Sequence, residues 1–138
     1  MNIPYKCAAQ AIAEAHDQWL AGEEDPYTVT VLDAGRNLVA FAKLDGARIV
    51  SIEASSGKAY SAVSLEAPSD EYLPLVAPGQ PLYGLETSQS KPLVLFKGGM
   101  PVFSGGKLSG GVGVSGGPLE QDERIATMIA NRISELMG

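Results

Sequence analysis

Cysteine and histidine are nearly absent from this sequence. Among 138 residues there is one cysteine, Cys7, and one histidine, His16. A single cysteine excludes an internal disulfide and any metal site built from cysteines, and it is typical of a protein in a reducing compartment. Cys7 is most simply interpreted as a small core residue.

Positive charge and long hydrophobic runs are also scarce. Ten scattered lysines and arginines stand against sixteen acidic residues, which gives a formal net charge of −6. No basic patch follows from this distribution, so neither nucleic acid nor an anionic membrane is an expected partner. The N-terminal stretch is alanine-rich and amphipathic without an uninterrupted apolar segment, so we expect no secretory signal or membrane span. We predict a cytoplasmic protein.

Glycine, by contrast, is concentrated in one segment. Nine of the sixteen glycines lie between Gly98 and Glu123. A glycine within a strand costs chain entropy on folding and contributes no side-chain packing. A glycine-rich strand therefore indicates bulges, tight hairpins or the close approach of a ligand or another chain. Residues 111–116 match the G-x-G-x-x-G pattern, but a dinucleotide site also needs a second strand with an acidic residue about 20 positions on. A final helix occupies that place, so nucleotide binding is not expected.

The periodicity of apolar residues predicts one α/β (α+β) domain over residues 1–138, with helices packed on a five-stranded antiparallel sheet. A proline-rich excursion over residues 67–92 contains two single helical turns, at 70–76 and 82–87. The predicted helices cover residues 4–22, 48–65 and 117–138, and the predicted strands cover 27–32, 38–44, 93–96, 100–103 and 108–114. Gly35 is expected to supply the turn between the first two strands.

Several short motifs resemble the GlcG/HbpS-like family, the so-called haem-degrading domain. They are residues 31–35 (VLDAG) with 38–41 (LVAF), 45–47 (DGA), 57–60 (GKAY), 98–101 (GGMP), and 110–117 (GGVGVSGG) with 121–123 (QDE). The resemblance implies a profilin-like α/β sandwich that assembles into homo-oligomers. The family includes haem-binding sensors, a domain of corrinoid adenosyltransferases and small proteins encoded with acid catabolism. The chain departs from the family pattern at Lys43-Leu44, where Arg-Met is usual, and lysine binds carboxylates differently from arginine.

The resemblance also implies a role for His16. In some members a histidine of the first helix is implicated in haem coordination, which makes His16 the best protein ligand for haem iron in this chain. The alternative is a half-exposed helix histidine without a ligand.

Two further groups of residues are candidates for chemistry. Ser115, Gly116 and Gly117 join a strand to a helix N-terminus, where free N–H groups favour an anion; the alternative is internal capping by Glu120, Asp122 or Glu123. Lys58, Asp45 and Glu120 are candidates for an acid or base, although Lys58 also fits the edge of an amphipathic helix.

These observations predict a homo-oligomeric small-molecule-binding protein of the GlcG/HbpS type, with haem or a related tetrapyrrole as ligand and no other cofactor. The alternative is an enzyme that acts on a small carboxylic acid by proton transfer or hydrolysis.

Overall fold

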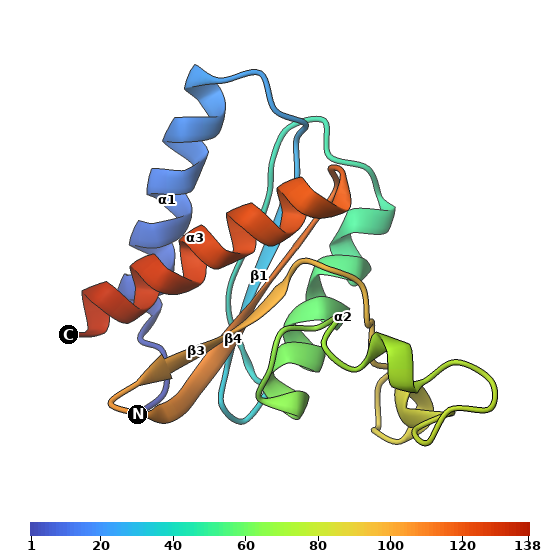
Figure 1. Cartoon of the computed structure of the whole chain (residues 1–138). Coiled ribbons are helices and arrows are strands. Elements are labelled where there is room, and N and C mark those ends of the chain that lie inside the picture. Colours follow the sequence, from blue (N-terminus) through green and yellow to red (C-terminus); the bar gives the residue numbers. More distant parts are fainter.

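The computed structural model describes all residues, 1–138, and contains one antiparallel sheet between two layers of helices. In Figure 1, helices α1 and α3 lie on one face of the sheet and α2 lies on the other. No helix is both long and apolar enough to cross a membrane. The elements in chain order are α1 (Tyr5–Ala21), β1 (Thr28–Asp33), β2 (Leu38–Lys43), α2 (Val50–Leu65), the 3-10 turns η1 (Leu73–Leu75) and η2 (Leu85–Thr87), β3 (Gly99–Ser104), β4 (Lys107–Ser115) and α3 (Leu119–Met137).

The strands lie in the order β2-β1-β4-β3, and each neighbouring pair is antiparallel. Two hairpins therefore meet at the centre of the sheet, where β1 pairs with β4 from Thr28 opposite Ser115 to Asp33 opposite Gly110. The β3–β4 turn uses Gly105 and Gly106, with φ of +59° and +77°. Glycine populates this region at little steric cost, so these two residues suit the tight turn of a hairpin.

The sheet has four strands, so the prediction of a fifth over residues 93–96 is wrong. This segment packs on α2 instead: Leu93 and Leu95 are buried in one cluster with Ala59 and Val63. The Val94 N–H donates to Ser61 Oγ at 2.7 Å, which replaces a bond to a neighbouring strand. The segment gains burial and a hydrogen bond from a helix, and a pattern of apolar residues cannot distinguish this from pairing in a sheet.

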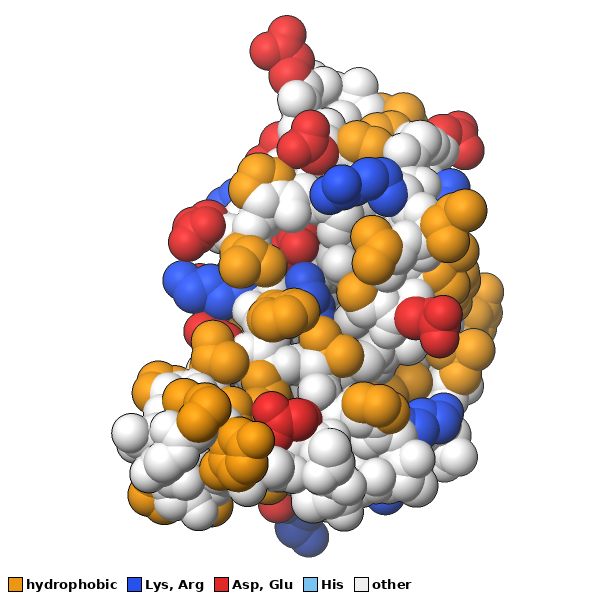
Figure 2. Space-filling model, turned by 90° about the vertical axis from the view of Figure 1, so that its right-hand side faces the viewer, with side chains coloured by type: hydrophobic (Ala, Val, Ile, Leu, Met, Phe, Trp, Pro, Cys, Tyr) orange, Lys and Arg blue, Asp and Glu red, His pale blue; other side chains and the backbone are white.

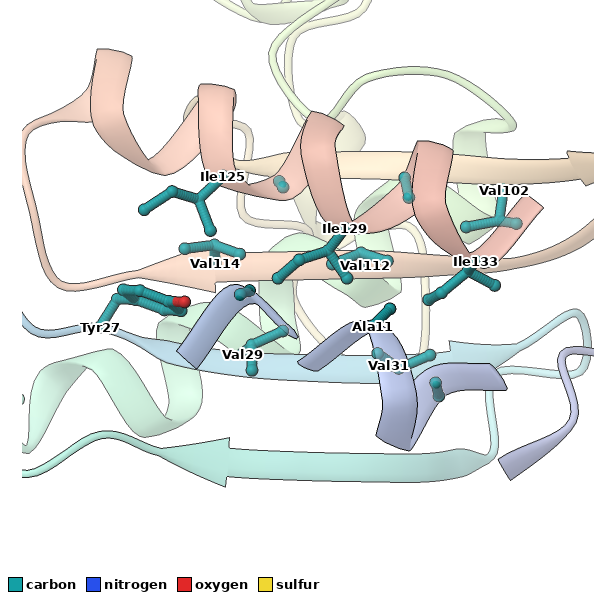
Figure 3. Close-up of a cluster of buried hydrophobic side chains, with 14 of the residues drawn as sticks. Ala11, Tyr27, Val29, Val31, Val102, Val112, Val114, Ile125, Ile129 and Ile133 are labelled. Carbon is teal, nitrogen blue, oxygen red and sulfur yellow. The ribbon is translucent and has the colours of Figure 1, made fainter. Parts of the chain in front are cut away.

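The larger core lies between the sheet and the α1/α3 layer (Figure 3). The alternating valines of β1 and β4 point into it and meet one apolar stripe of α3. Alanines of α1 complete the cluster and let that helix pack closely. The central members are Val29, Val31, Val112, Val114, Ile125, Ile129 and Ile133.

Tyr27 lies at one end of this core and is only 1% exposed. Burial, and to a smaller extent the Glu24 carboxylate, raises the pKa of Tyr27 to about 12. Because an unfolded tyrosine ionises near pH 10, the folded state keeps its proton while the unfolded chain loses it. Stability from this group is therefore complete below about pH 10 and is lost as the pH rises toward 12.

We expect the substitution Tyr27→Phe to flatten this alkaline loss. Between pH 9 and pH 11 the free energy of unfolding, measured with urea, should fall by about 1 kcal/mol less than in the wild type. Tyr83→Phe is the matched control, because Tyr83 is 68% exposed. Equal slopes in the wild type and both variants would contradict the assignment.

On the other face of the sheet, α2 packs unusually close to the strands. Its inner side carries small residues, and β4 faces it with Gly111 and Gly113. A Cβ atom at Gly113 would lie 2.6 Å from the backbone nitrogen of Ala59 and closer still to the Ser55 carbonyl oxygen. The glycines are therefore explained by a helix of the same chain.

Hydroxyl groups hold this interface together. Thr28 Oγ1 and Ser51 Oγ are 2.7 Å apart, and Thr30 Oγ1 and Ser55 Oγ are 2.8 Å apart. All four side chains are fully buried. Since each of these four hydroxyls has a partner, the pairs carry little desolvation penalty and fix the position of α2 along β1.

Candidate functional site

The only histidine lines an open cleft between α1 and β2, here called the His16 cleft. Its volume is about 460 Å³, and most of its wall is apolar, formed by Ala9, Ile12 and Ala13 of α1 and Ala40 and Ala42 of β2. The His16 side chain is half-buried and makes no hydrogen bond to the rest of the chain. Its ring stacks on Trp19, with the centroids 5.8 Å apart and the planes 24° from parallel. The imidazole is thus oriented while its ring nitrogens stay free to bind a ligand.

Two charged residues, Lys43 and Asp45, lie at the rim of the His16 cleft, and both are exposed. Lys43 is the last residue of β2, and Asp45 follows it in the turn toward α2. The structure therefore brings two of the predicted site residues, His16 and Asp45, to the same cleft. Lys43 adds a positive charge that an anionic group of a ligand could use.

Lys58 lies elsewhere, in a buried ion pair with Asp122 of α3. Its Nζ is 3.1 Å from Asp122 Oδ2 and donates to the Val114 carbonyl at 3.0 Å, and both side chains are only 2% exposed. Burial lowers the pKa of Lys58 and raises that of Asp122, while the attraction between the two charges opposes both shifts. Lys58 therefore connects α2 to α3 past the end of β4, and its ammonium group is closed to solvent.

At the Ser115-Gly116-Gly117 turn, a side chain of the same protein takes the place proposed for an external anion. The Gly117 N–H donates to Asp122 Oδ1 at 3.1 Å, and the Gly116 N–H also points to this carboxylate. These contacts match internal capping by Asp122, the alternative to an external anion at this turn. Glu120 is exposed and faces Lys97 at 3.5 Å, away from the His16 cleft.

A second cleft contains residues that the sequence patterns did not single out. It lies between the β1–β2 hairpin, α2 and the segment 91–94, has a volume of about 600 Å³, and is here called the Arg36 cleft. Arg36, Lys91, Glu53 and Tyr60 are its charged and phenolic residues. Apart from Tyr60, which belongs to the 57–60 (GKAY) motif, no sequence pattern marks them, because they come from a turn, a loop and a helix that only tertiary packing brings together.

The turn that carries Arg36 differs from the prediction. Gly35 was expected to adopt the left-handed conformation of this turn, but its φ is not positive. Arg36 adopts that conformation instead, with φ of +66°. Asp33 Oδ1 accepts from the N–H groups of Gly35 and Asn37, at 2.8 and 3.0 Å, so a side chain organises the turn. Non-glycine residues adopt this region rarely, and strain of this kind is concentrated at functional sites.

Fold and clefts together define a small α+β domain with an open, histidine-lined, largely apolar cleft, a class suited to holding a small molecule. A family model described as haem degrading protein HbpS-like matches residues 5–130. The chain belongs to this HbpS-like family.

Three relatives support this assignment. A 15.0 kDa protein encoded between dhaT and dhaS in Citrobacter freundii is 37% identical over 94% of this chain and 91% of its own length. The crystal structure of ORFY from Klebsiella pneumoniae has a TM-score of 0.84 and 35% identity, covering 92% of this chain and 88% of that one. The structure of a PduOC–haem complex has a TM-score of 0.79 and 32% identity, covering 92% of this chain and 89% of that one.

Proposed function

We propose that this protein binds haem, or a related tetrapyrrole, in the His16 cleft, with His16 as the protein ligand to the iron. The observation that carries the proposal is the position of the only histidine: oriented by Trp19, free of hydrogen bonds and facing an apolar cleft. Neutral imidazole is a common axial ligand of haem iron. The haem complex of a relative with 32% identity supports the same ligand class.

The lining of the cleft fits such a group. Alanines from α1 and β2 leave an apolar wall of low relief, which suits the flat face of a porphyrin. Lys43 at the rim offers a positive charge to a propionate, at the position where the family resemblance implies an arginine. Haem, when bound, supplies a redox-active iron; the chain's own residues bind and orient it.

We expect His16→Ala to weaken haem binding by about tenfold or more and to change the Soret band of the complex, because the iron loses its protein ligand. Titration of the protein with haem, followed by absorption, measures both effects. Gln18→Ala is the matched control, since Gln18 is exposed on the same helix and does not line the His16 cleft. If the haem spectra and the affinity were unchanged in His16→Ala, His16 would not be the iron ligand. Any haem binding would then be adsorption to the apolar wall.

The alternative of an enzyme with Lys58, Asp45 and Glu120 as its acid or base gains no support from the geometry. Lys58 is buried in an ion pair, Glu120 faces Lys97, and Asp45 lies at the rim of the His16 cleft. General acid–base catalysis needs such groups within reach of one substrate. The three residues do not form a common site.

We also propose that the protein assembles into a homo-oligomer. Large hydrophobic side chains gather in the lower part of the face shown in Figure 2, and the proline-rich excursion with the segment after it leaves Leu73, Leu75, Leu82, Tyr83 and Phe96 exposed. The sheet also has two open edges, β2 and β3. Exposed apolar clusters and unpaired edges are typical of surfaces that a second copy covers.

Sedimentation at micromolar concentration should therefore show a species larger than the 14.4 kDa monomer. The double substitution Leu82→Glu/Tyr83→Glu should shift it toward monomer, because two carboxylates would have to be buried in the interface. A wild-type protein that sediments only as a monomer would contradict this proposal.

A further inference from the structure

The Arg36 cleft carries a local charge opposite to that of the whole protein. The chain has a net charge of −6, yet this cleft is lined by two cations, Arg36 and Lys91, and by one acidic residue, Glu53. Neither cation takes part in any of the five ion pairs of the structure. Two cations without a carboxylate partner at one cleft form a local attraction for an anion.

Neutral groups hold the Arg36 guanidinium in one orientation. Its Nη1, with two N–H groups, lies within hydrogen-bond distance of three acceptors, Tyr60 Oη at 3.0 Å, Gln89 Oε1 at 3.0 Å and Ser64 Oγ at 3.2 Å, so one N–H is shared. Its Cζ lies 4.7 Å above the centre of the Tyr60 ring. The Nε and Nη2 atoms donate to no protein atom. These two nitrogens form one edge of the guanidinium, the fork that binds a carboxylate through two parallel hydrogen bonds.

Tyr60, the residue that holds the Arg36 guanidinium, is itself held in place by burial and a second contact. Tyr60 is only 6% exposed, and its Oη also contacts Ser90 Oγ at 3.2 Å. The hydrogen bond with Ser90 lowers the pKa of Tyr60, and the charge of Arg36 acts in the same direction. An arginine fixed by a buried ring loses little entropy when an anion binds, so more of the interaction energy appears as affinity.

Much of the remaining wall of the cleft is apolar. Leu32 and Leu38 from the hairpin and Pro92 and Val94 from the loop line it. Thr30 and Ser56 also line it, and their hydroxyl oxygens are 3.1 Å apart and pair with each other. A volume of about 600 Å³ suits a small organic molecule and exceeds what an inorganic ion needs. The lining is therefore complementary to a ligand with a charged end and an apolar body.

We propose that the Arg36 cleft binds a small carboxylic acid with an apolar body, whose carboxylate pairs with the Nε–Nη2 edge of Arg36 and with Lys91. The body lies against Leu38, Pro92 and Val94. This site is separate from the His16 cleft: it is lined by α2 and by Thr30 and Leu32 of β1, whereas the His16 cleft is lined by α1. The two clefts open on opposite faces of the sheet, so this proposal does not depend on haem binding.

The probe for the test is 4-fluorobenzoate, and its uncharged counterpart is 4-fluorobenzamide. Fluorine NMR titration of the full-length protein should show saturable binding of the acid, at least about tenfold tighter than binding of the amide, because charge-assisted hydrogen bonds to arginine are lost with the amide. Arg36→Gln should weaken binding of the acid by about tenfold or more, and Lys91→Gln by a few-fold. Arg36→Lys should restore only part of the affinity, since lysine has no fork.

Two control variants test whether the acid binds in the Arg36 cleft and not elsewhere on the protein. Arg124→Gln removes an exposed arginine that pairs with Glu24 and does not line the cleft, and it should leave the affinity for 4-fluorobenzoate unchanged. His16→Ala should also leave it unchanged, so that failure of haem binding and failure of this proposal are distinguishable. Lys91 is exposed and free of ion pairs, so Lys91→Gln tests the site even where Arg36→Gln disturbs the turn.

Equal affinity for the acid and the amide, or affinity unchanged in both Arg36→Gln and Lys91→Gln, would overturn the proposal. Saturation by inorganic phosphate without any binding of 4-fluorobenzoate would also overturn it, because the cleft would then select a compact anion and not a carboxylate with an apolar body.

Discussion

The substitution Gly113→Ala is expected to destabilise the domain by about 4 kcal/mol or more, beyond the 1–3 kcal/mol usual for overpacking. The added Cβ would lie 2.6 Å from the Ala59 nitrogen and closer to the Ser55 carbonyl, and both are backbone atoms of α2 that no rotamer change can move. Relief requires α2 to leave the sheet, which breaks the hydroxyl pairs that join Thr28 to Ser51 and Thr30 to Ser55. Urea unfolding followed by circular dichroism measures the loss.

Gly22→Ala is the control for Gly113→Ala. A Cβ at Gly22 would meet its nearest neighbours at 3.5 and 3.9 Å, an ordinary contact distance, and its φ of −113° suits any residue. That variant should change the free energy of unfolding by less than about 1 kcal/mol. If Gly113→Ala were as stable as Gly22→Ala, the close approach of α2 would not be the reason for glycine in β4.

The second large effect is expected at the buried ion pair. Lys58→Met should cost about 3–5 kcal/mol, because it leaves the Asp122 carboxylate buried without its counter-charge. The double variant Lys58→Met/Asp122→Asn should recover much of this loss, since it removes both charges and keeps an oxygen for the Gly117 N–H. Lys97→Met is the surface control: its partner Glu120 is 80% exposed, and such pairs contribute less than about 1 kcal/mol.

The pH dependence of Lys58→Met provides an independent check. Without Lys58, burial raises the pKa of Asp122 further above its ordinary value of 3.8, so the folded state binds a proton at a higher pH than the unfolded chain does. The free energy of unfolding of the variant should therefore rise as the pH falls toward 4. The difference in this free energy between the variant and the wild type should narrow. A gap that is constant between pH 7 and pH 4 would argue against an unpaired buried carboxylate.

Local sequence signals predicted most of the secondary structure. The helix over 4–22 is observed as Tyr5–Ala21, the hairpin strands 27–32 and 38–44 as Thr28–Asp33 and Leu38–Lys43, and the two turns of the excursion as short 3-10 segments. These elements depend on apolar periodicity, proline and glycine within a few residues. The segment 93–96 was wrongly predicted as a strand because burial on α2 and burial in a sheet require the same apolar residues.

The candidate site was predictable only in part. His16 could be selected because it is the sole histidine, and the structure places it in a cleft with Asp45. The partner of Lys58 was not predicted, because 64 residues separate it from Asp122 in the chain. Arg36 and Lys91 carry no motif, so their convergence on one cleft could not be predicted from spacing.

By itself the sequence determined the identities and lengths of the helices, the two tight hairpins, the glycine-rich strand and the family, since each depends on residues close together in the chain or on short motifs. The tertiary structure decided the strand order β2-β1-β4-β3, the seating of α2 on Gly111 and Gly113, and the pairing of Lys58 with Asp122. It also decided which charges share a cleft. These features depend on the free energy of burying groups that are distant in the chain, which local periodicity does not encode.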